Sequence, residues 1–117
     1  MSKEQTKRLD VLIRRVVFNE EGQCYVCGRT PSDLAHLFVR SRLFTRWDRR
    51  NCHALCRWCH SQSHAGEDVY TQRFIEREGR EAYDQLKLDS NSRVWLVGAF
   101  KDQIEEQLNE EVRNTDG

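Results

Sequence analysis

The sequence predicts an α+β fold, in which a small core of two strands and one helix lies between an N-terminal helix and a helical C-terminal extension. Three observations predict it. Apolar residues recur at helical spacing near both ends, short apolar runs flank an arginine-rich stretch in the middle, and two Cys-x-x-Cys pairs enclose that middle part. The chain has 117 residues, the length of one domain, and we expect a single domain over 1–117.

The first element is a helix expected over residues 3–19, because five apolar side chains recur there every 3.6 residues. These are Leu9, Leu12, Ile13, Val16 and Val17. The core is expected over 23–66, with a strand within 34–39 and a returning strand that starts at Cys52. A helix should begin at the second cysteine pair and run to about residue 66.

The C-terminal extension, residues 67–113, is expected to contain only helices. Asp68 can cap a first helix that ends at Gly79, and a second helix is expected at about 80–88. A third helix, about 92–112, carries an apolar stripe and an acidic face. That stripe either covers the core or faces a protein partner or a second copy of the chain.

Four of the five cysteines form the pairs Cys24/Cys27 and Cys56/Cys59. The polar N-terminus has no signal-peptide character and no apolar run could cross a bilayer, so we expect a cytoplasmic protein without a membrane partner. Paired cysteines in a reducing compartment favour metal binding over disulfides, although redox-active or merely buried cysteines are the alternative. Four thiolates predict a closed, structural Zn²⁺ site. For Cys52 we expect a small buried apolar residue.

Charge is distributed unevenly, although the formal net charge is zero. Residues 29–60 hold seven arginines against Asp33 and Asp48, a net charge of +5, whereas residues 61–117 carry seven basic and thirteen acidic side chains, a net of −6. A basic middle indicates a surface that faces an anion such as nucleic acid. Ordinary surface scatter is the alternative.

Three histidines and one asparagine are expected to converge in the core. His60 and His64 lie four residues apart on the expected helix, a spacing that lets two imidazoles hold one metal ion. His36 lies on the first strand, and Asn51 precedes the second. If the strands form a hairpin packed on the helix, all four side chains approach one point. For His53 we expect a structural or solvent-exposed role.

These motifs resemble the HNH endonuclease superfamily, whose core is the ββα-metal fold. The resemblance rests on Cys24-x-x-Cys27, Ala35-His36, Arg46-Trp47-Asp48, Asn51 and Cys56-x-x-Cys59-His60. Within the superfamily, the stretch that begins at Tyr70 is similar to phage-borne recombination nucleases of the lambda NinG/Rap type. The resemblance implies a metal-dependent nuclease in which His36 is the general base, Asn51 orients that base, and His60 binds the catalytic metal, with His64 as a further ligand.

One position departs from the family pattern. Many members carry a metal-binding aspartate or histidine directly before the base, where this chain has Ala35. Strand alternation is expected to turn Asp33 to the face opposite His36. The catalytic ion, Mg²⁺, Mn²⁺, Ni²⁺ or Zn²⁺, would then rest on two histidines and water, and such nitrogen ligands favour the last three metals.

The expected partner is DNA, single-stranded or branched, in the host cytoplasm if the chain is phage-encoded. Arginines of the loop between the strands should contact its phosphates. They are Arg40, Arg42, Arg46, Arg49 and Arg50. Trp47 could stack on a base, but burial is the favoured expectation. The competing function is a zinc-ribbon module that binds nucleic acid without cutting it, or an adaptor built on the C-terminal helices.

Overall fold

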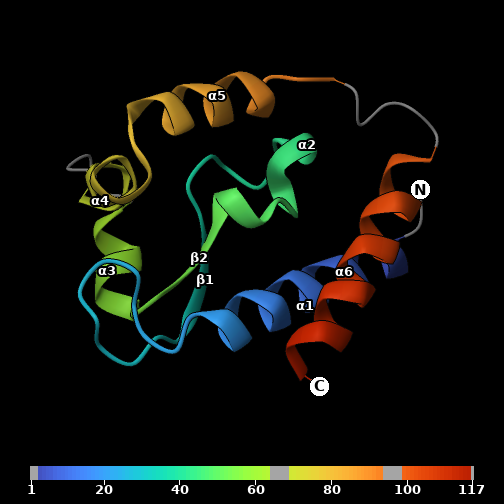
Figure 1. The fold of residues 1–117 in the computed structure, drawn as a ribbon, viewed down its shortest axis with the longest axis horizontal. Coiled ribbons are helices and arrows are strands. Elements are labelled where there is room, and N and C mark those ends of the chain that lie inside the picture. The colour runs from blue at the N-terminus through green and yellow to red at the C-terminus, as the bar shows by residue number, and fades with distance from the viewer. Residues whose placement is uncertain (1–2, 64–68, 94–98, 117) are drawn as a thin grey trace.

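The structure is a computed structural model that describes residues 3–63, 69–93 and 99–116 (Figure 1). A two-stranded antiparallel sheet lies in the middle, with helices on both of its faces. In chain order the elements are α1 Lys3–Glu20, β1 Asp33–His36, α2 Leu43–Arg46, the 3-10 turn η1 Arg49–Asn51, β2 Cys52–Leu55, α3 Arg57–Gln62, α4 Val69–Glu78, α5 Arg80–Ser90 and α6 Phe100–Asp116.

The register of the hairpin decides which side chains share a face. Ala35 lies opposite His53, and His36 lies opposite Cys52. Because cross-strand partners share a face, His36 and Cys52 point to one side, and Ala35 and His53 to the other. All of β2 is buried, since both faces are covered. Among the described residues β1 pairs only with β2, so the outer edge of β1 is open.

The first face of the sheet packs on α1 and α6, which lie side by side (Figure 1). Leu9 and Ile13 of α1 are fully buried there, against Cys52 and Ala54 of β2. Leu108 of α6 closes the cluster from outside. Full burial of a leucine or isoleucine contributes about 1.5–3 kcal/mol, so this cluster fixes α1 beside the hairpin.

The second face packs on α4 and α5. Ala35 and Leu55 of the hairpin contact a cluster that includes Tyr70 and Phe74 of α4 and Leu86 of α5. Gly79, with φ of 97°, separates these two helices in a conformation that side chains with a Cβ rarely adopt. The hairpin is therefore held between two helical layers, one formed by α1 and α6 from the two ends of the chain and the other by α4 and α5.

Most of the expected elements are present. The N-terminal helix, the hairpin and a helix that follows it are present, although the first strand spans 33–36, the helix after the hairpin ends at Gln62 and not near residue 66, and the last helix begins at Phe100. Two short elements, α2 and η1, fold the arginine-rich loop and were not predicted from the sequence. The expected cap Asp68 lies outside the described residues. No described helix is long and apolar enough to cross a membrane.

Candidate functional site

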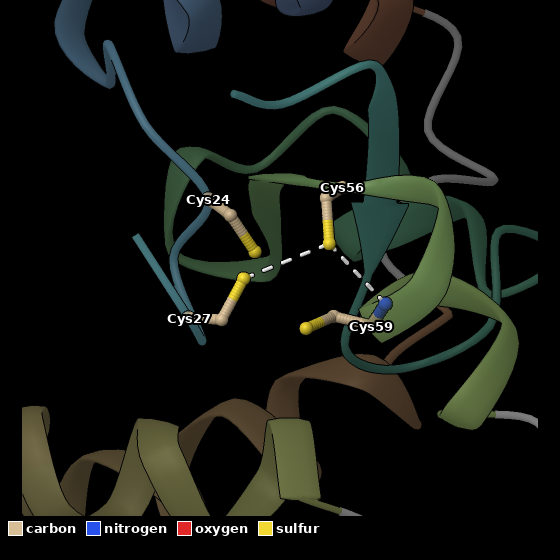
Figure 2. Close-up of side chains that lie close together, drawn as sticks. All are labelled: Cys24, Cys27, Cys56 and Cys59. Atoms are coloured by element: carbon tan, nitrogen blue, oxygen red, sulfur yellow. Dashed lines mark hydrogen bonds between the residues drawn. The ribbon is translucent and has the colours of Figure 1, made fainter. Parts of the chain in front are cut away.

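The four cysteines of the two Cys-x-x-Cys pairs meet in space (Figure 2). Their sulfur atoms all lie within 4.8 Å of one another, and Cys27 Sγ is 3.7 Å from Cys56 Sγ. Two sulfurs bound tetrahedrally to one zinc ion at about 2.3 Å are separated by about 3.8 Å. The cluster can therefore hold a structural metal such as zinc, as the spacing predicted.

The local backbone conformation at each cysteine pair determines where these thiols lie. The turn after α1 closes with a hydrogen bond from Gly28 N to the Cys24 carbonyl, and Gly28 has a positive φ of 80°. On the other side, Cys56 caps α3 by accepting a 3.4 Å hydrogen bond from Cys59 N. Burial opposes ionisation of Cys24, but backbone N–H groups of Cys27 and Cys56 bring its pKa down to about 7. Thiolates form readily at this position, as a metal site requires.

His36 lies on β1 with a defined orientation. Its Nε2 is 2.9 Å from the Arg46 carbonyl. A carbonyl only accepts, so Nε2 carries the proton and Nδ1 keeps its lone pair. Among the described residues, Nδ1 has no hydrogen-bond partner. Burial lowers the pKa of His36, a shift opposed by its hydrogen bond to Arg46, so the ring is neutral near pH 7 and can accept a proton.

Asn51 is fully buried between the strands, where its side chain bonds only to the backbone. Its Oδ1 accepts from Phe38 N at 2.7 Å, while Nδ2 donates to the carbonyls of Phe38 and Thr45 at 3.0 and 3.1 Å. These bonds tie both ends of the loop between β1 and β2 together. Asn51 thus fixes the segment that contains the Arg46 carbonyl, and acts on His36 through that backbone.

Asp33 lies on the face opposite His36, as strand alternation predicted, yet both residues line the same cleft. Asp33 is the first residue of β1, and the cleft runs along the open edge of that strand, which both faces border. Asp33 Oδ2 is 2.9 Å from His60 Nδ1 on α3. The bond to His60, opposed by burial, holds the pKa of Asp33 below its usual range, so the carboxyl is ionised.

The 2.9 Å between Asp33 Oδ2 and His60 Nδ1 is a hydrogen-bond distance, and the proton on Nδ1 would have to leave before both atoms could bind one metal ion. Adjacent ligands of an octahedral ion at 2.0–2.1 Å lie about 2.9–3.0 Å apart. A carboxylate oxygen beside an imidazole nitrogen is a mixed donor set, which suits Mg²⁺ better than two histidines would. Among the described residues only the four cysteines form a cluster of three or more possible metal ligands, so a catalytic ion at Asp33 and His60 stays a prediction. The further expected ligand, His64, lies outside the described residues.

The cleft has a volume of about 670 Å³ and is bordered by α1, β1 and α3. Besides His36, His60 and Asp33 it is lined by three exposed arginines. They are Arg14, Arg40 and Arg57. Only Arg40 was among the arginines singled out from the sequence. Arg14 and Arg57 were missed, and a hint existed for Arg14, because it follows Asp10 by four residues on α1 and so shares its face.

The other arginines of the loop are held by carboxylates of the same chain. Arg46 makes a bidentate pair with Asp10, with distances of 3.1 and 2.8 Å. Arg49 bonds to Glu20 and Glu21 at 2.7 Å each, and Arg50 bonds to Asp48 and Asp89. These three guanidinium groups fasten the loop to its surroundings, and their expected phosphate contacts stay a prediction. Arg42 is exposed.

Three further side chains are buried and have structural roles. His53 is 4% exposed, with its ring 4.0 Å from that of Tyr25 and its Nδ1 2.6 Å from the Tyr70 hydroxyl, so it is not solvent-exposed. Cys52 is fully buried, as expected. Trp47 is buried at 2% exposure, and its indole N–H donates to Asp10.

A match with a known protein family shows to which family the chain belongs. The family described as Bacteriophage Lambda NinG protein matches residues 2–116. The chain belongs to the NinG family. NinG membership indicates a role related to phage recombination and confirms the expected phage relationship, whereas the wider HNH assignment stays a prediction. No curated protein and no solved structure matches the chain.

Proposed function

We propose that this NinG-family protein is a metal-dependent endonuclease of the HNH type that hydrolyses DNA phosphodiester bonds. The observation that carries the proposal is the cleft along β1. It combines a neutral, oriented histidine, an ionised carboxylate paired with a second histidine, and three exposed arginines. A module that only binds nucleic acid would need the arginines but neither an oriented base nor a carboxylate–imidazole pair.

The three arginines would bind and orient the DNA backbone. Phosphate contacts position a duplex or a strand without reading its sequence, so Arg14, Arg40 and Arg57 predict weak sequence preference. Arg57 is also suited to exchange partners. Its side chain is 82% exposed while it bonds to Asp33, and an exposed ion pair contributes little, so a phosphate can replace the carboxylate at small cost.

His36 would act as the general base. A water molecule attacking phosphorus loses its proton to Nδ1, while Nε2 remains bonded to the Arg46 carbonyl and so stabilises the imidazolium that forms. The bond from phosphorus to the leaving 3′ oxygen then breaks. Asp33 and His60 would hold the divalent ion, which supplies positive charge to the phosphate and to the leaving oxygen.

The test is relaxation of supercoiled plasmid and cleavage of labelled branched DNA, with several divalent metals and with chelator, alongside a binding assay on the same preparations. His36→Ala should lower turnover by about 10² to 10⁴-fold while leaving DNA affinity and zinc content unchanged, because a base acts only as the transition state forms. Asp33→Asn and His60→Ala should instead raise the metal concentration needed for half-maximal cleavage.

Two outcomes would contradict the proposal. If His36→Ala cuts as fast as the unmodified protein, His36 is not the base. If pure protein binds DNA but cuts none of these substrates with any metal, the non-catalytic zinc module is the better description.

A further inference from the structure

Asp10, near the middle of α1, accepts four hydrogen bonds from the loop between the strands. Three come from the consecutive residues Arg46 and Trp47, and a longer one, at 3.4 Å, comes from Arg40 Nη2. Asp10 Oδ1 accepts from Arg46 Nε at 3.1 Å and from Trp47 Nε1 at 2.8 Å, and its Oδ2 accepts from Arg46 Nη2 at 2.8 Å. The Arg46 side chain is only 14% exposed. Bidentate contact with a largely buried guanidinium fixes direction as well as distance.

The backbone of Arg46 is the part that meets the proposed base. Its carbonyl accepts from His36 Nε2 at 2.9 Å and from the buried Cys52 thiol at 3.3 Å. Arg46 ends α2, a helix of four residues, which is too short to hold its own shape. The side-chain anchor on Asp10 therefore helps to decide where this carbonyl points.

We infer that Asp10 is a positioning residue for His36, acting through Arg46. The connection runs from a carboxylate on α1, through one guanidinium and its own carbonyl, to the imidazole on β1. The inference rests on the proposed function, since it assigns a purpose to the orientation of His36. Asp10 borders the cleft, but both of its oxygens already accept hydrogen bonds, so it is not assigned to the metal or to DNA.

The charge of Asp10 supports the same role. A guanidinium as buried as that of Arg46 is costly when unpaired, so loss of the carboxylate would drive Arg46 toward water and carry the loop with it. Asp10 also offsets the repulsion that Arg46 and Arg40 exert on a protonated His36. The Asp10 carboxylate thus maintains both the position of the Arg46 carbonyl and the electrostatic potential around the His36 ring.

The first test observes His36 directly and needs no cleavage. Nitrogen NMR of the imidazoles in zinc-loaded protein should show one dominant tautomer for His36, with the proton on Nε2. Asp10→Ala should convert this signal to a mixture of tautomers. Glu105→Ala, which removes the ion pair of α1 with Arg8, serves as the matched control and should leave it unchanged. An unchanged single tautomer in Asp10→Ala would overturn the inference.

The second test uses kinetics. Asp10→Ala should lower kcat by about 10 to 100-fold with KM within two-fold, since orientation of a base is used in the transition state. Arg46→Ala keeps the carbonyl and should lose a similar factor. Because both residues act in one chain of contacts, the double variant should lie within three-fold of the worse single variant. Losses that multiply would show that Asp10 acts by another route.

A third variant covers the possibility that Asp10→Ala fails to fold. Asp10→Asn keeps the size and one acceptor, and should give an intermediate kcat and an intermediate tautomer ratio. A wild-type protein that cuts no DNA would defeat the proposed nuclease while leaving the NMR comparison decisive for Asp10.

Discussion

Replacement of Asn51 by alanine should destabilise the protein strongly, because the side chain is fully buried and makes three hydrogen bonds to the loop backbone. The two bonds donated by Nδ2 contribute about 1 kcal/mol each, and the Phe38 N–H that loses its acceptor costs about 1–3 kcal/mol. The sum is a loss of about 3–5 kcal/mol. For a domain of this size, this corresponds to a fall in Tm of about 12–20 °C.

The assay is thermal unfolding of the zinc-loaded protein followed by circular dichroism, with Asn91→Ala as control. Asn91 is exposed at the end of α5, so its replacement should change stability by less than about 0.5 kcal/mol. Asn51→Asp should be no better than alanine, because its charged oxygen would face two carbonyls. If Asn51→Ala melts within about 2 °C of the unmodified protein, the loop is not held by this side chain, and the orientation of His36 needs another explanation.

Three other outcomes follow from the structure. Cys56→Ser should release one equivalent of zinc and lower Tm, since metal-binding free energy adds to folding; unchanged zinc content would contradict a four-cysteine site. Joint replacement of the three cleft arginines by alanine should remove about three phosphate contacts and so flatten the slope of log K for DNA binding against log salt concentration, measured by titration at several salt concentrations. Arg42→Ala alone should remove one contact at most. His53, with a pKa lowered by burial to about 3 in the folded state, takes up its proton on unfolding, so its contribution is complete above about pH 6.5 and is lost as the pH falls toward 3. His53→Phe should therefore reduce the slope of unfolding free energy against pH by about 1.4 kcal/mol per unit between pH 6 and 4, measured by urea unfolding, and an unchanged slope would show that His53 is not buried neutral.

The sequence predicted the parts of the site that depend on local spacing. The four cysteines could be assigned to one metal site because each Cys-x-x-Cys pair presents two thiols from a single turn, so only two short segments had to come together. Asn51 and His36 could be assigned to the hairpin because short apolar runs mark its strands. These features required no knowledge of how distant helices pack.

The features that were missed depend on distant partners. Arg46 and Arg49 looked free because their carboxylates, Asp10 and Glu20, lie some thirty residues away on α1. Strand alternation placed Asp33 correctly on the face opposite His36, but it could not show that residues from both faces of β1 line one cleft. The cleft lies along an edge, and a residue at the strand end reaches that edge from either face.

The open edge of β1 has a consequence for the behaviour of the protein in solution. Unpaired strand edges are templates for aggregation, and proteins protect them with short strands and charged side chains. Here the strand has four residues, and Arg14 and Arg57 stand along its edge, Arg14 donating to the Ser32 carbonyl just before it. The charges that would attract a phosphate backbone thus also prevent two molecules from pairing strand to strand. Arginine variants made to weaken DNA binding should accordingly be checked for self-association before their affinities are compared.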